Sequence, residues 1–160
     1  MVVKQFEFSL DRLLKVKRQL ERLAEMEQLR AREAVDRARA NLQEFREQLT
    51  RVADQLNASI GRPMAAFQWT SVYDLADRLG QSIRTSEQEV TETEQKLLAA
   101  AQERAQIAAE VEALANLRQQ QWTQWRQEAQ KVDQDRLDEI GMRQWQAARG
   151  ETMGGPQSPS

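Results

Sequence analysis

The sequence contains no cysteine and no histidine among its 160 residues. Disulfides, thiol nucleophiles and the usual cysteine or histidine metal sites are therefore excluded. The lack of histidine also removes the side chain that most often serves as a general base near neutral pH. Cysteine-free chains are typical of the cytoplasm, which is the compartment that we expect.

Glycine, proline and aromatic residues are scarce, with 6 glycines, 3 prolines and 6% aromatic residues. Ala, Glu, Gln, Arg and Leu dominate instead, and charged residues make up 30% of the chain. This composition is typical of long helices or a coiled coil. Large apolar side chains are too few for the core of a compact globule.

The net charge is only −2, and acidic and basic residues alternate along the chain. Such mixing favours a solvated helix surface, and it argues against a nucleic-acid partner or a basic helix that lies on a membrane. No apolar run approaches the roughly 20 residues of a membrane span, and the first residues lack the pattern of a signal peptide.

The spacing predicts a long first helix over residues 9–59, with Ser9 as its cap and with Phe8 and Leu13 at the flanking staple positions. Two heptad tracks follow, and the frame then shifts by four residues, which indicates a stutter. The expected core residues are, on one track, Leu10, Lys17, Ala24, Ala31 and Ala38; on the other, Leu13, Leu20, Glu27 and Ala34; and after the stutter, Leu42, Phe45, Leu49, Val52 and Leu56.

A single break interrupts the helical pattern, because Gly61 suits a helix C-cap and Pro63 prevents the helix from continuing. We expect a turn at 60–70, a second helix over 71–149 capped by Ser71, and a disordered tail at 150–160. The predicted fold class is all-α, a long antiparallel two-helix coiled-coil hairpin. Because the second helix is longer, its last part, from Trp125 to Arg149, has no partner within the chain, which indicates an external partner or fraying.

The sequence offers little that suggests catalysis, because it has no glycine-rich phosphate loop and no nucleophile elbow. Asp135, Asp138 and Glu139 lie near one another on the helix and are able to hold a cation, but a solvated charged face is the favoured interpretation. A hairpin also lacks a dry pocket in which to shift a carboxylate pKa. We therefore expect no enzyme activity, no cofactor and no small-molecule substrate.

Several residues allow two interpretations. Trp122 and Trp125 either close the open end of the hairpin against Phe6 and Phe8 or contact a partner, and the first is favoured. Aromatic residues at the turn either plug its tip or dock on another protein. Polar residues at core positions either set the register or keep the hairpin loose. The turn aromatics are Phe67 and Trp69, and the polar core residues are Lys17, Glu27, Arg104 and Arg118.

Three stretches in order resemble the FliJ family of flagellar export proteins. They are the opening FEFSLDRLLKVKRQLERLAEMEQLRARE, the stretch WTSVYDLADRLGQSI, and the C-terminal WRQEAQKVDQDRLDEIGMRQW. The resemblance implies a cytoplasmic stalk, peripherally associated with the membrane at the export apparatus, that promotes assembly and activity of the hexameric flagellar export ATPase. It also implies contact with the export-gate membrane protein and escort of export chaperones.

The resemblance further implies two sets of contact residues. The gate contact would lie just past the turn, at Leu75, Leu79, Ser82 and Ser86. The ATPase contact would lie at the terminal end, at Phe6, Phe8, Leu13, Leu20, Trp125, Val132, Leu137 and Ile140. Two alternatives remain open, namely the equivalent stalk protein of a virulence type III secretion system and a generic structural coiled coil that dimerises through the end of the second helix.

Overall fold

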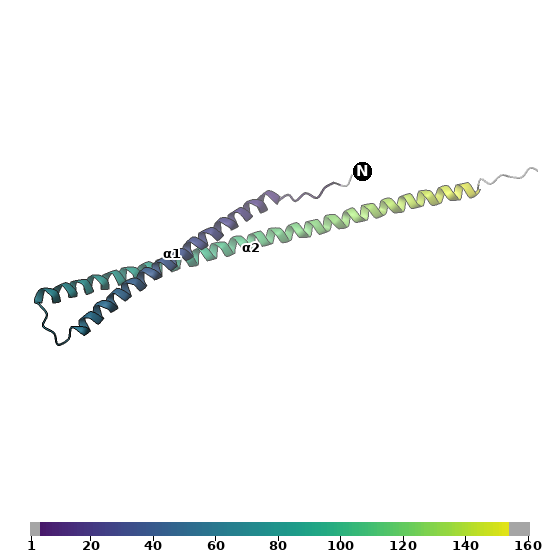
Figure 1. The fold of residues 1–160 in the computed structure, drawn as a ribbon. Coiled ribbons are helices and arrows are strands. Elements are labelled where there is room, and N and C mark those ends of the chain that lie inside the picture. The colour runs from purple at the N-terminus through teal and green to yellow at the C-terminus, as the bar shows by residue number, and fades with distance from the viewer. Residues whose placement is uncertain (1–3, 154–160) are drawn as a thin grey trace, which may run out of the picture. The chain divides into compact units, whose positions relative to one another are not determined.

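The structure, a computed structural model, describes residues 4–153 and places two helices in them. Helix α1 spans Asp11–Ala58 and helix α2 spans Ala66–Met153. No strand occurs in this part of the chain. The two long helices pack against each other, so the predicted all-α fold is confirmed (Figure 1).

The described residues divide into two units. A hairpin unit, Lys15–Val111, holds most of α1, the turn and the first half of α2, and its two helices run antiparallel (Figure 1). A terminal unit combines residues 4–14 with residues 112–153 of α2. The two units are described separately below.

The seam of α1, meaning its buried and half-buried stripe, follows alternating steps of three and four residues without interruption. Because this is a continuous heptad, the expected stutter after Ala38 is wrong. The seam residues are Leu14, Lys17, Glu21, Ala24, Gln28, Ala31, Val35, Ala38, Leu42, Phe45, Leu49, Val52 and Leu56.

The expected register is correct on one track and off by one residue on the other. Leu14 is 1% exposed, whereas Leu13 is 43% exposed. Glu21 likewise is half-buried, whereas Leu20 is exposed. The size and hydropathy of their side chains favoured Leu13 and Leu20 as seam residues. The buried residues Val35, Ala38 and Leu42 set a different spacing, which places Glu21 and Gln28 in the seam instead.

Polar contacts between the helices accompany this polar part of the seam. Lys17 forms an ion pair with Glu110, and both side chains are half-buried. Arg104 donates to Gln28 Oε1 at 2.9 Å and to Glu25 Oε1 at 3.3 Å. These contacts favour the interpretation in which polar residues near the core set the register.

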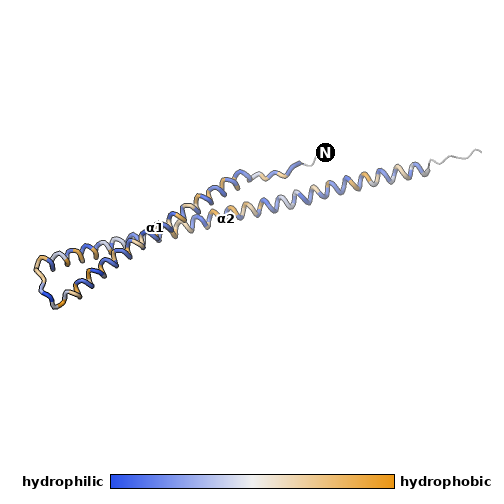
Figure 2. Tube along the Cα trace, viewed as in Figure 1, coloured by the Kyte–Doolittle hydropathy of each residue, from blue (hydrophilic) through white to orange (hydrophobic). Residues whose placement is uncertain are grey.

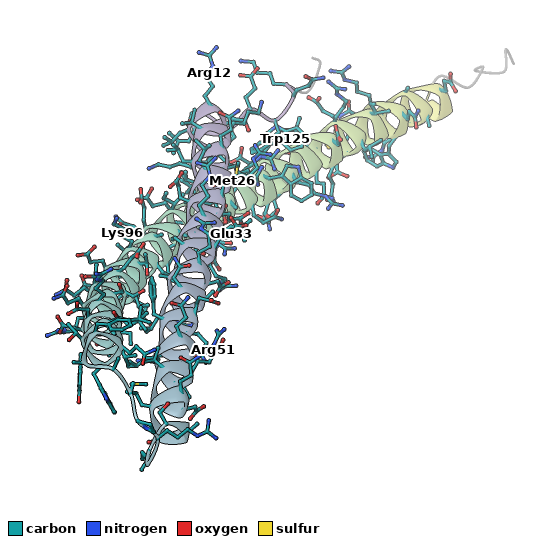
Figure 3. All side chains as sticks on the ribbon, turned by 60° about the vertical axis from the view of Figure 1, so that its left-hand side comes forward. Arg12, Met26, Glu33, Arg51, Lys96 and Trp125 are labelled. Atoms are coloured by element: carbon teal, nitrogen blue, oxygen red, sulfur yellow. The ribbon has the colours of Figure 1, made fainter. Side chains whose placement is uncertain are left out.

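Two further ion pairs join the helices nearer the turn. Arg39 Nη2 lies 2.9 Å from Glu94 Oε1, and Arg46 Nη2 lies 3.4 Å from Glu87 Oε1. These pairs are exposed, so each adds little to stability, on the order of 0.5 kcal/mol. Figure 3 shows the outer faces: Arg51 points away from α2, and Lys96 points away from α1.

The turn is shorter than expected. α1 ends at Ala58, and Gly61 has a φ of 84°, the left-handed conformation that favours glycine. α2 then begins at Ala66, five residues before the expected start at Ser71. Ala65 stands at the N-cap position, and Gln68 Oε1, three residues on, accepts a hydrogen bond from the Ala65 backbone N–H at 3.1 Å. The Ser71 hydroxyl donates to the Phe67 carbonyl within the helix, so the expected Ser71 cap is wrong.

The two ends of the chain also differ from expectation. α1 begins at Asp11 rather than residue 9, and the Asp11 N–H donates to the Phe8 carbonyl at 3.1 Å. α2 continues to Met153, four residues past the expected end at Arg149. The tail was expected over 150–160, and its part at 154–160 lies outside the described residues.

Apolar and polar residues alternate along both helices (Figure 2). The half-buried positions of α2 include Leu97, Ile107 and Leu114. Burial ends near Ala129, and every side chain from Gln130 to Glu151 is exposed. We call residues 130–151 the overhang of α2.

Candidate functional site

The terminal unit holds an aromatic contact between the N-terminal segment and α2. Residues 4–8 have no regular secondary structure, and the Phe6 ring lies 6.0 Å from the Trp125 ring. The Trp125 indole N–H donates to the Lys4 backbone carbonyl at 3.2 Å. The Arg118 guanidinium lies 5.6 Å from the centre of the Phe6 ring, a distance that suits a cation–π contact.

This contact confirms half of the favoured interpretation of the two tryptophans. Trp125 packs against Phe6 as expected, whereas Trp122 lies under the Arg126 guanidinium at 5.3 Å. Phe8 is only 8% exposed, so it belongs to the core of this unit rather than to its surface. Trp125, which lies on α2 (Figure 3), remains half-buried beside an open groove lined by Lys4, Gln5, Phe6, Glu7, Gln121, Gln124 and Glu128.

The overhang carries the three remaining α2 residues of the expected ATPase contact. Val132, Leu137 and Ile140 are 52%, 67% and 44% exposed. On a helix of 100° per residue they fall within one broad arc, which Asp133 and Arg136 share, and we call these three apolar residues the overhang stripe. The overhang therefore presents three large apolar side chains to solvent on one side of the helix.

The two α1 residues of the expected ATPase contact are also on the surface. Leu13 and Leu20 are 43% and 40% exposed. Val16 and Leu23, at 50% and 58%, extend this exposed apolar face, and sequence reasoning did not identify them. The signal was present as the spacing 13, 16, 20, 23, but the sequence interpretation assigned Leu13 and Leu20 to the seam.

The expected gate contact divides between surface and seam. Leu75 is 46% exposed, and Ser82 is half-buried in a groove that Phe45 and Arg78 also line. Leu79 and Ser86 are 6% and 3% exposed, since they face α1. Of the four residues, Leu75 and Ser82 are therefore the accessible ones, and Leu79 and Ser86 are buried.

The turn itself exposes aromatic surface. Phe67 is 72% exposed, and Tyr73 is 65% exposed. The Trp69 ring packs on the Tyr73 ring with their centres 6.2 Å apart. Exposed aromatic side chains of this kind often mark a contact with another protein.

The acidic residues and the helices bear on metal binding and on membrane insertion. Among residues 4–153, no group of three or more acidic side chains is arranged to hold a metal ion, and that includes Asp135, Asp138 and Glu139. No helix in the same range is apolar enough over a sufficient length to cross a membrane. The exposed apolar stripes instead suit helix-to-helix contacts.

The fold and these surfaces define a class of protein, the antiparallel coiled-coil hairpin that presents helical surfaces to partner proteins. Within this class, the family model of the flagellar FliJ protein matches residues 6–150. The chain therefore belongs to the FliJ family, which gives it a role in flagellar protein export. No curated protein and no solved structure matches the chain.

Proposed function

We propose that this chain is a stalk component of the flagellar export apparatus that docks on the hexameric export ATPase through its terminal unit. In this proposal the chain binds the ATPase and performs no catalysis itself. Its binding promotes assembly and activity of the ATPase ring. It acts in the cytoplasm, peripherally associated with the membrane at the apparatus. Membership of the FliJ family supports the setting.

The observation that carries the docking proposal is the complete exposure of the overhang. All described side chains from 130 to 151 are exposed, and they include Val132, Leu137 and Ile140. A helix without tertiary packing is only marginally stable in water, so an apolar stripe on such a helix favours a partner that covers it. Phe6, Phe8 and Trp125 form the base from which this helix projects within the terminal unit.

The second part of the proposal concerns the hairpin unit. Leu75 and Ser82 would contact the export-gate membrane protein, and Leu79 and Ser86 would support that face from the seam. Escort of export chaperones would use the exposed aromatic surface near the turn, where Phe67 is the most exposed aromatic residue. Both contacts rest on the family and on the exposure of these side chains.

Hydrolysis of ATP by the export ATPase of the same organism, measured with and without the full chain, tests the docking proposal. We expect stimulation together with ring assembly visible by electron microscopy. Replacing both Val132 and Ile140 by Glu should abolish the stimulation. The matched control replaces Met142 and Trp145 by Glu, since these residues are 62% and 59% exposed and lie outside the stripe.

Each outcome is informative because the helical content of every variant is measured beside its effect on the ATPase. Stimulation by the wild-type chain that survives Glu at Val132 and Ile140 would exclude the overhang as the docking surface. Equal loss in the control variant would show that net charge, rather than the apolar stripe, decides the effect. Absence of stimulation by the wild-type chain would exclude the stalk role.

A further inference from the structure

One face of α1 in the hairpin unit is apolar, yet it lies outside the seam. Val16, Leu20 and Leu23 follow the spacing i, i+4 and i+7, so they share a face, and they are 50%, 40% and 58% exposed. We call these three residues the outer stripe. The neighbouring seam positions Lys17 and Glu21 are polar, so the more apolar face of this segment is the exposed one.

The overhang is a second apolar surface of the same kind. Its stripe of Val132, Leu137 and Ile140 is comparable in length to the outer stripe, since each covers two to three helical turns. Each stripe belongs to a well-formed α-helix. Two helical stripes of matching length are able to pack side by side.

The two segments that carry the stripes have net charges of opposite sign. Residues 12–23 of α1 contain five basic side chains and one acidic side chain. Residues 128–139 of α2 contain five acidic side chains and two basic ones. The two segments have the same length, and their net charges are +4 and −3. Such complementarity increases the rate of encounter and selects the partner.

We propose that a second copy of this chain covers the outer stripe, with the overhang of one copy packed on the outer stripe of the other. Each copy offers both surfaces, so two identical contacts form in a dimer with two-fold symmetry. Arg12 lies on α1 at the edge of the outer stripe, and Glu128, Asp135 and Glu139 lie along the edge of the overhang stripe near Val132. These side chains supply the electrostatic part of the contact.

The pairing has one consequence for the regulation of docking, and this consequence alone rests on the proposed function. Leu20, Val132, Leu137 and Ile140 belong both to the dimer contact and to the proposed ATPase contact. Self-association therefore keeps the docking surface covered until the ATPase competes for it. The pairing itself is independent of the ATPase and can be tested without it.

Sedimentation velocity of the full chain over a wide concentration range tests the pairing. We expect the mass to rise from 18.5 kDa toward twice that value as concentration increases. Replacing Leu20 and Leu23 by Glu should weaken the dimer by about tenfold or more, since two apolar contacts are lost. Leu29→Glu is the matched control, because Leu29 is 57% exposed on α1 but lies on another face, and it should leave the dimer unchanged.

Charge reversal then identifies the partner surface. Glu at Arg12, or Lys at Glu128, Asp135 and Glu139, should each weaken the dimer, and the chain that combines all four changes should recover it. Recovery distinguishes a direct contact from loss of folding, which circular dichroism monitors in each variant. A wild-type chain that stays monomeric throughout, an equal effect of Leu29→Glu, or a combined variant that fails to recover would each overturn the pairing. The ATPase assay with the wild-type chain is a separate measurement, so failure of the pairing and failure of the docking proposal can be told apart.

Discussion

The indole N–H of Trp125 donates a hydrogen bond to the backbone carbonyl of Lys4 at 3.2 Å, across 121 positions of the sequence. This bond joins a segment without regular secondary structure to the C-terminal half of α2. The Phe6 ring reinforces it from 6.0 Å. The first residues of the described chain are therefore held to a defined place on α2.

Trp125→Phe should release this segment while leaving both helices intact. Phenylalanine keeps an aromatic contact with Phe6 but cannot donate to the Lys4 carbonyl, so we expect a loss of about 1 kcal/mol of local stability. Hydrogen exchange at residues 4–8 measures the change. Trp122→Phe is the control, since Trp122 contacts Arg126 instead, and equal effects of the two changes would contradict the assignment.

Leu14→Ala and Leu13→Ala test the register of the seam. Leu14 is 1% exposed, so its truncation should lower the free energy of unfolding by about 2–4 kcal/mol. Leu13 is 43% exposed, so its truncation should cost less than about 1 kcal/mol. Chemical denaturation of both variants gives the comparison. A larger loss of unfolding free energy for Leu13→Ala than for Leu14→Ala would support the register expected from the sequence, in which Leu13 lies in the seam.

Gln68→Ala and Ser71→Ala test the start of α2. The Gln68 side chain accepts from the Ala65 N–H, so its loss should cost about 0.5–1 kcal/mol of stability. Ser71 bonds within the helix to the Phe67 carbonyl, and alanine is the better helix former, so Ser71→Ala should be neutral or slightly stabilising. Thermal unfolding followed by circular dichroism distinguishes the two residues. A larger loss at Ser71 would return the cap to that residue.

Gly80→Ala and Gly61→Ala should change the stability of the protein in opposite directions. Gly80 lies inside α2 with no atom within 4 Å of an added Cβ, so alanine should stabilise the protein by about 1 kcal/mol. The site around Gly61 is equally open, but its φ of +84° disfavours a side chain, so alanine there should destabilise by about 1 kcal/mol. Melting temperatures of the two variants, measured side by side, check the signs.

The two helices and their pairing could be predicted because composition, the single Gly-Pro break and the heptad spacing all indicate the same fold. The register could be predicted only in part. Leu13 and Leu20 are larger and more apolar than Glu21 and Gln28, yet the latter two lie in the seam. Hydropathy alone does not reveal that ion pairs and small residues take the place of leucine there.

The candidate site divides in the same way. Exposure of Val132, Leu137 and Ile140 follows from the unequal lengths of the helices, and the sequence was sufficient to predict it. Burial of Leu79 and Ser86 follows from the faces that the two helices present to each other, which the family pattern does not specify. The outer stripe was missed because Leu20 was expected in the core, so its spacing to Val16 and Leu23 was not recognised as a surface pattern.

The distribution of side chains along the α1 seam affects how the hairpin unit folds and opens. Near the turn the seam contains Leu42, Phe45, Leu49, Val52 and Leu56, and farther from the turn it contains Lys17, Glu21, Ala24 and Gln28. Contacts near the turn also close the shortest loops, so they form at the lowest entropic cost. The two helices should therefore pair first beside the turn, and they should separate first at the end of the hairpin unit that is distant from the turn. When the helices separate in this order, the turn and the apolar seam beside it stay intact. The more polar part of α1 is then free to leave α2 and contact another protein.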